Sequence, residues 1–150
     1  MFMTDKKQAK GSYILIIKLK ENHRISVGKL ASTTFLPGVY LYVGKAKNGL
    51  KGRLRRHLNK EKKLFWHIDY FLQKAKIEEV WIKPDFFEEC QIAREIKNLL
   101  KDSLFPLKRF GSSDCLCPSH LLFLPKDKFD LISLRKKLFF ERIDLYGAQV

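Results

Sequence analysis

The stretch Gly38–His57, GVYLYVGKAKNGLKGRLRRH, constrains the fold more than any other part of this chain. Residues 38–44 alternate, so Tyr40 and Tyr42 face the same side of an expected strand. A short basic loop leads into an expected helix, whose leucines at 50, 54 and 58 form a core stripe. Arg53 and His57, four residues apart, lie along one edge of that stripe. The strand and the helix therefore bring two phenols, a guanidinium and an imidazole together, a combination suited to binding a phosphodiester.

Length and composition favour one folded domain. The 150 residues are 45% hydrophobic and 13% aromatic, which suffices for one core and argues against general disorder. No apolar run is long enough for a membrane-spanning helix, and the first ten residues lack the apolar region of a secretory signal. We therefore expect a cytoplasmic protein. The odd number of cysteines, three, argues against a disulfide framework.

The charge points to a polyanionic partner. The net charge is +14, and the stretch Lys45–Lys63 holds nine Lys or Arg residues and one carboxylate, Glu61. Such a field attracts nucleic acid first and anionic membranes second. The alternative without function is a solvated, lysine-rich surface, but surfaces of that kind usually mix positive and negative side chains.

The rest of the chain predicts further strands and helices. Residues 11–19 are apolar on both faces, with Tyr13, Leu15 and Ile17 on one side, which is typical of a central strand. We expect strands at 24–30, 77–82 and 121–124, a loop at 32–34, and helices at 64–75, from 85 onward, and at 127–146. The fold class is α+β, a small mainly antiparallel sheet flanked by helices. We divide the chain into a basic tail (1–10), a domain (11–125), and a C-terminal basic amphipathic helix and tail (126–150).

Glu89 stands out on the helix expected to begin near Asp85. Asp85 as N-cap and Glu88 three residues later resemble a capping box, while Glu89 falls within the apolar face. A carboxylate turned toward a core needs a cation or hydrogen-bond donors. The alternative is a first-turn glutamate stabilised by the helix dipole. We favour a metal or a cationic partner.

The segment RFGSSDCLCPSHLLFL contains small donors and possible metal ligands. Its turn, residues 111–114, is suited to presenting amides and hydroxyls to a phosphate. Cys115, Cys117 and His120 could suggest zinc, but they supply only three ligands at an unusual spacing. A buried structural role for these cysteines is favoured.

The order Tyr42-Val43-Gly44, basic loop, Arg53, His57 resembles the GIY-YIG nuclease family, in particular a compact branch ending in Ser-Ser-Asp-Cys-x-Cys-x-x-His. The resemblance covers roughly residues 11 to 124. It implies a small antiparallel sheet and hydrolysis of a nucleic-acid phosphodiester with one divalent metal, Mg²⁺ or Mn²⁺. It also implies roles for individual residues. Tyr42 is the tyrosine of the second half-motif, and Arg53 stabilises the phosphate. His57 helps to activate or orient the attacking water, and Glu89 holds the metal.

The first half-motif has two candidates. Gly11-Ser12-Tyr13 opens a strand as the motif requires, but Tyr13 lies 29 residues before Tyr42, where the family has a short hairpin. Tyr40 follows a glycine in the same way, yet it shares a strand with Tyr42. We favour Tyr13. The family's late asparagine has no clear counterpart, and Ser112, Ser113 and Asp114 occupy about its place.

The resulting hypothesis is a metal-dependent endonuclease, a hydrolase of nucleic-acid phosphodiester bonds in DNA repair or processing. DNA is the favoured substrate, and the choice between DNA and RNA stays open. The catalytic residues are those of the resemblance, with Tyr13 as the first tyrosine. The expected substrate-binding residues are basic or small and polar: Lys45, Lys47, Lys51, Arg55, Arg56, Ser112 and Ser113. Two alternatives stay open, a nucleic-acid-binding module without catalysis and a membrane-surface protein that uses its C-terminal helix. The primary hypothesis involves no membrane, and nothing in the residues indicates an oligomeric state.

Overall fold

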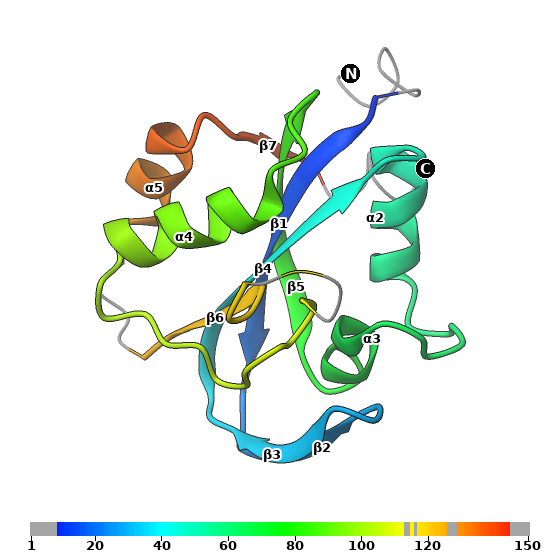
Figure 1. Cartoon of the computed structure of the whole chain (residues 1–150). Helices are drawn as coiled ribbons and strands as arrows, with labels where there is room; N and C mark the ends of the chain where they lie inside the picture. The colour runs from blue at the N-terminus through cyan, green and yellow to red at the C-terminus, as the bar shows by residue number, and fades with distance from the viewer. Residues whose placement is uncertain (1–8, 113–114, 116, 126–128, 145–150) are drawn as a thin grey trace.

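The computed structural model describes residues 9–112, 115, 117–125 and 129–144 (Figure 1). Its strands are β1 (Gly11–Leu19), β2 (His23–Val27), β3 (Ala31–Phe35), β4 (Gly38–Ala46), β5 (Lys76–Pro84), β6 (Leu121–Leu124) and β7 (Glu141–Ile143). Its helices are α2 (Leu50–Leu58), α3 (His67–Leu72), α4 (Glu89–Leu99) and α5 (Leu131–Lys137).

Five strands form one antiparallel sheet in the order β6-β4-β1-β5-β7. Strand β1, which is apolar on both faces, lies at the centre of this sheet, as the sequence predicts. Side chains of β1 are buried on both faces of the sheet. The predicted α+β class is therefore confirmed.

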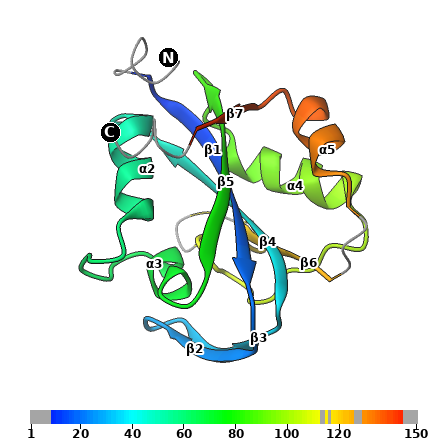
Figure 2. The same ribbon diagram turned by 180° about the vertical axis from the view of Figure 1, so that it is seen from behind.

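Helices cover both faces of the sheet (Figures 1 and 2). On one face Tyr13 and Leu15 of β1 and Tyr42 of β4 pack with α2 and α3, where Leu54 and Phe71 are fully buried. On the other face the alternate residues of the same strands pack with α4 and α5. The period of two in the strands thus divides the core into two layers.

A hairpin explains the long separation of the two half-motifs. Residues 32–34, expected as a loop, belong to β3, which pairs with β2 in a sheet of two strands. This hairpin lies between β1 and β4, and the chain then returns so that β4 runs antiparallel beside β1. Tyr13 is opposite Gly44, and Leu15 is opposite Tyr42. The two tyrosines therefore lie on neighbouring strands, although 29 residues separate them.

Two predicted helix starts are wrong. The helix expected at 64–75 is limited to α3, because the Asp69 carboxylate accepts hydrogen bonds from the backbone N–H groups of Phe65 and Trp66 and so fixes its first turn. The capping box at Asp85 does not form. Since β5 continues to Pro84, Asp85 takes a left-handed conformation, with φ at 63°, and α4 begins only at Glu89.

The C-terminal helix is also shorter than predicted. It ends at Lys137, Phe139 adopts a left-handed φ of 59°, and residues 141–143 form β7 beside β5. Leu134 and Leu138 are buried as expected. Among the residues described here, no helix has the length and apolar character that crossing a membrane requires.

Candidate active site

A cavity of about 570 Å³ opens where β4 leaves its neighbour β6. Strand β6 pairs only with Val39–Tyr42, so residues 44–46 of β4 lie at the edge of the sheet within the described chain. Side chains from both faces can meet around such an edge. The cavity is lined by polar and aromatic groups that include Tyr13, Tyr42, Lys45, Arg53, His67 and Glu89.

Tyr13 and His57 form a buried pair at the floor of this region. The hydroxyl of Tyr13 lies 2.7 Å from Nε2 of His57, and both side chains are almost fully buried. The ring of Tyr13 lies over Gly44, where a Cβ atom would come within 2.4 Å of Cζ and Oη. Gly44 is therefore needed for the close approach of Tyr13 to the strand.

Burial shifts the proton affinities of this group. Loss of solvent raises the pKa of Tyr13 to about 12, although the neighbouring Arg53 lowers it, and burial also raises the pKa of Tyr42 well above its usual range. Burial, together with Lys62 and Arg53, lowers the pKa of His57 to about 3. At neutral pH both phenols are protonated and His57 is uncharged.

Arg53 is held at the cavity wall by two contacts. Its Nη1 donates to the backbone oxygen of Lys45 at 2.9 Å, and its guanidinium lies 4.3 Å from the ring centroid of Trp66. The bond to Lys45 uses one of five guanidinium N–H groups. Arg53 thus has a defined position from which it can meet an anion.

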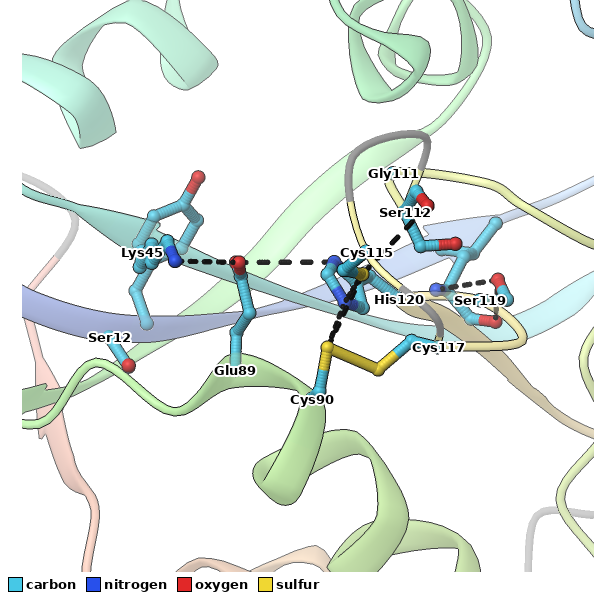
Figure 3. Close-up of polar contacts among 12 residues, drawn as sticks. Ser12, Lys45, Glu89, Cys90, Gly111, Ser112, Cys115, Cys117, Ser119 and His120 are labelled. Carbon is cyan, nitrogen blue, oxygen red and sulfur yellow. Dashed lines mark hydrogen bonds and ion pairs between the residues drawn. A yellow bond between two sulfur atoms is a disulfide. The ribbon is translucent and has the colours of Figure 1, made fainter.

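Glu89 reaches the cavity from the first turn of α4, on the opposite face of the sheet. Its Oε1 lies 3.2 Å from Nζ of Lys45, and its Oε2 lies 4.0 Å from Nδ1 of His120 (Figure 3). The expected cationic partner of Glu89 is therefore present as a lysine. The carboxylate side chain retains 16% exposure, so it is accessible from the cavity.

The two candidates for the first tyrosine are clearly separated. Tyr13 lines the cavity. Tyr40 is fully buried between Phe71 and Phe123, and its hydroxyl donates to the backbone oxygen of Leu36. Tyr40 is thus a core residue, and of the two candidates Tyr13 is the one that lines the cavity.

The expected substrate-binding residues fall into different environments. Lys45 and Lys47 line the cavity. Lys51 and Arg55 lie on α2, half-buried and exposed respectively, and do not line it. Arg56 also lies on α2, but it belongs to the structural pair described next.

The Arg56 guanidinium binds the fully buried Asp69 carboxylate through two hydrogen bonds of 2.7 and 2.8 Å. Burial opposes ionisation of Asp69, but the hydrogen bonds from Arg56 and from two backbone N–H groups outweigh it and lower the Asp69 pKa. Arg56 therefore stabilises the start of α3.

The expected phosphate-binding turn is not exposed at Ser112. This side chain is fully buried, and within the described structure its Oγ has no hydrogen-bond partner. Ser113 and Asp114, predicted to act beside it, lie outside the described residues.

Aromatic residues complete the wall. His67 lines the cavity, and its Nδ1 accepts a 2.8 Å hydrogen bond from the N–H of Gly111, so its Nε2 carries the proton of the neutral ring. Trp66 and Tyr70 are partly buried and pack against the core, and Trp66 also lines the cavity. Phe65 lines the cavity too and is 75% exposed.

A family model described as "Domain of unknown function DUF123" matches residues 12–139. The chain belongs to the DUF123 family. No curated protein and no solved structure matches the chain. The matched range includes both tyrosines, the Arg53–His57 helix, Glu89 and the cysteine segment.

The DUF123 chain also gathers its sulfur ligands beside this cavity. Cys90, the residue after Glu89, joins Cys115, Cys117 and His120 in one group whose ligand atoms all lie within 4.8 Å of one another. The structure links Cys90 and Cys117 in a disulfide, contrary to the expectation of none, and Cys115 keeps its thiol. The sequence pattern indicates only three of these ligands, because Cys90 precedes Cys115 by 25 residues.

Proposed function

We propose that this DUF123 chain is a divalent-metal-dependent nuclease of the GIY-YIG type, acting on DNA in repair or processing. The observation that carries the proposal is the 2.7 Å contact between Tyr13, which lines the cavity, and the buried His57, with Arg53 and Glu89 lining the same cavity. Side chains that the resemblance implies for the reaction thus come together from β1, α2 and α4. Their chemistry fits hydrolysis of a phosphodiester.

Tyr13 and His57 can orient the attacking water as a pair. A phenol with its pKa raised to about 12 does not ionise at neutral pH, so Tyr13 alone is a poor base. With His57 protonated on Nδ1, its Nε2 accepts the hydrogen bond from Tyr13. The oxygen of Tyr13, held in place by this bond, can then accept a hydrogen bond from the attacking water and orient it. Because burial lowers the pKa of His57 to about 3, the proton of that water goes to bulk solvent and not to Nε2. The phenol then never carries a full negative charge in its buried environment.

Arg53 and the lysines supply positive charge to the phosphate. The guanidinium presents a planar set of donors as negative charge develops on the phosphate oxygens. Lys45 and Lys47 line the same cavity, whose described lining includes a single carboxylate, Glu89. The net charge of +14 attracts the polyanion from a distance.

Glu89 fits a hydrated divalent cation of the Mg²⁺ or Mn²⁺ type. Such ions often bind through one carboxylate, with water and substrate phosphate as the other ligands. Among the described residues that line the cavity, Glu89 is the acidic one, and its side chain retains 16% exposure. When bound there, the ion would neutralise charge on the leaving oxygen.

The Lys45–Glu89 ion pair supports a second candidate, a nucleic-acid-binding module without catalysis. The contact of 3.2 Å neutralises the carboxylate without any metal. If that pair persists in solution, the basic cavity would bind phosphate and leave it intact.

The experiment that separates the two candidates is cleavage of labelled duplex, branched and single-stranded DNA and RNA, with EDTA, Mg²⁺ or Mn²⁺. We expect metal-dependent cleavage by the parent protein and loss of cleavage in Glu89→Gln. The matched control is Glu88→Gln, because Glu88 is the preceding residue and is exposed. Melting curves with EDTA and with Mn²⁺ give an independent measurement, since a bound ion stabilises the parent but not Glu89→Gln.

Metal-independent binding with no cleavage of any substrate would favour the binding module. Equal stabilisation of the parent and of Glu89→Gln by Mn²⁺ would show that Glu89 does not hold the ion.

A further inference from the structure

Four soft ligands from two distant segments converge beside the cavity (Figure 3). Cys90 comes from the first turn of α4, and Cys115, Cys117 and His120 come from the segment that precedes β6. These are all three cysteines of the chain and one of its four histidines. Cys117 and His120 are buried, with 5% and 1% exposure.

The distances among these ligands fit a tetrahedral zinc site. With Zn–S about 2.3 Å and Zn–N about 2.0–2.1 Å, tetrahedral geometry separates two sulfurs by roughly 3.7–3.8 Å and a sulfur from a nitrogen by about 3.5 Å. Cys90 Sγ lies 3.3 Å from Cys115 Sγ and 3.4 Å from His120 Nε2, and Cys115 Sγ lies 3.6 Å from the same nitrogen. Three edges of the tetrahedron are therefore nearly in place.

A disulfide accounts for only half of this group. It joins Cys90 to Cys117 and gives no reason for Cys115 and His120 to point at the same sulfur. A thiol in contact with a disulfide can also attack it and exchange partners. A metal ion uses all four ligands at once.

We propose that the reduced protein binds one Zn²⁺ through the thiolates of Cys90, Cys115 and Cys117 and Nε2 of His120. A thiol or phosphine reductant supplies the two electrons that, with two protons, convert the disulfide into two thiols. Zn²⁺ then displaces three thiol protons. Three thiolates and one imidazole form a closed set of four ligands, which is typical of structural zinc.

The zinc ties α4 to the segment before β6 and so fixes one wall of the cavity. Glu89 precedes the ligand Cys90, and its Oε2 lies 4.0 Å from Nδ1 of the ligand His120. A carboxylate near the outer nitrogen of a zinc-bound histidine orients that ring. Zinc binding does not depend on the proposed nuclease activity, because none of its four ligands is assigned to the reaction.

The test begins with purification of the full chain under a phosphine reductant, addition of Zn²⁺ alone, and removal of excess ion. We expect about one zinc per chain by elemental analysis and a higher melting temperature that EDTA reverses. Replacement by Co²⁺ should give the visible absorption of tetrahedral cobalt and a thiolate charge-transfer band. After unfolding in EDTA without reductant, the zinc-loaded protein should yield three reactive thiols, whereas the disulfide form yields one.

Cys115→Ser distinguishes the two states most sharply, because Cys115 is outside the disulfide. We expect it to lose the bound zinc and the zinc-dependent rise in melting temperature. His120→Asn should do the same, and its matched control is His23→Asn, since His23 lies in the separate hairpin β2–β3. His120→Cys should fold and retain zinc, which keeps the test decisive if the other variants are unstable.

Less than about a tenth of a zinc per chain in the reduced parent would overturn the proposal. So would full zinc content and an unchanged zinc response in Cys115→Ser. Both readouts are independent of cleavage, so a protein that binds zinc but cuts nothing refutes the nuclease alone.

Discussion

Gly44→Ala tests whether the strand register and the Tyr13–His57 pair are as the structure has them. An added Cβ would come within 2.4 Å of Cζ and Oη of Tyr13. Normal contacts at this position begin at 3.4 Å, so the ring must move by about 1 Å. Tyr13 is 1% exposed and cannot turn toward solvent.

The cost of the substitution can be worked out from these contacts. Overpacking of a well-packed core costs about 1–3 kcal/mol. Displacement of the Tyr13 hydroxyl also removes its hydrogen bond to His57, a loss of about 1 kcal/mol. Gly44→Ala should therefore lower the free energy of unfolding by about 2–4 kcal/mol. In a Tyr13→Leu background the three contacted atoms, Cε2, Cζ and Oη, are absent. There the same change should cost less than about 0.5 kcal/mol.

The assay is urea unfolding of the parent, both single variants and the double variant, followed by tryptophan fluorescence at pH 7. Gly52→Ala on α2 is the matched control, because nothing lies within 4 Å of its added Cβ, and it should be neutral or slightly stabilising. Equal costs of Gly44→Ala in the two backgrounds would refute the predicted contact between Tyr13 and Gly44.

Two further substitutions separate catalysis from stability on helix α2. Arg53→Ala should leave the fold intact and reduce the rate of cleavage by at least about 10²-fold, as measured by steady-state kinetics. Arg53→Lys should restore little activity, because the planar guanidinium is lost. If Arg53→Ala is as active as the parent, helix α2 is not part of the active site. Arg56→Ala should lower the free energy of unfolding by about 2–4 kcal/mol because it leaves the buried Asp69 carboxylate without its cation, whereas the exposed Arg55→Ala should cost less than about 1 kcal/mol. The folded-state pKa of Asp69 is lowered, so the contribution of Arg56 to the free energy of unfolding should be fully present above about pH 4, near the pKa of Asp69 in the unfolded chain. It should fall at lower pH as Asp69 becomes protonated. Urea unfolding at several pH values measures this.

Local periodicity was sufficient to predict much of the fold and the helix of the candidate site. The two-residue period of β1 and β4 and the leucine spacing of α2 are properties of single segments, and burial on the two faces of the sheet follows from them. Arg53 and His57 were placed correctly on one helix for the same reason. His57 is more deeply buried than the predicted edge position, since the rings of Tyr13, Tyr42 and Trp66 pack around its imidazole.

Contacts between distant segments could not be read from such periodicity. The Arg56–Asp69 ion pair joins residues of α2 and α3, and the pattern within either helix does not predict how the two pack together. The β2–β3 hairpin was missed in part because Ser32, Thr33 and Thr34 have the polarity of a loop, although threonine also favours strands. The fourth ligand of the cysteine group was missed because Cys90 precedes Cys115 by 25 residues, and the tertiary fold alone brings the two together.

His57 provides a prediction about pH that is independent of catalysis. Burial lowers its folded-state pKa to about 3, whereas the unfolded chain binds a proton near pH 6.5. Between these values the unfolded state holds one more proton than the folded state, so the free energy of unfolding falls as the pH falls. The stabilising effect of neutral His57 is complete above pH 6.5. From pH 7 to pH 5 its loss amounts to about 2 kcal/mol.

Urea unfolding of the parent and of His57→Gln at intervals from pH 7 to pH 5 isolates this contribution. Carboxylates and His67, whose pKa burial also lowers, affect both proteins alike, so the difference in slope belongs to His57. The parent should lose about 1 kcal/mol more per pH unit than His57→Gln over this range. Parallel curves would mean that His57 is solvated and gains its proton equally in both states. The buried Tyr13–His57 pair, on which the orientation of the attacking water depends, would then not be as the structure has it.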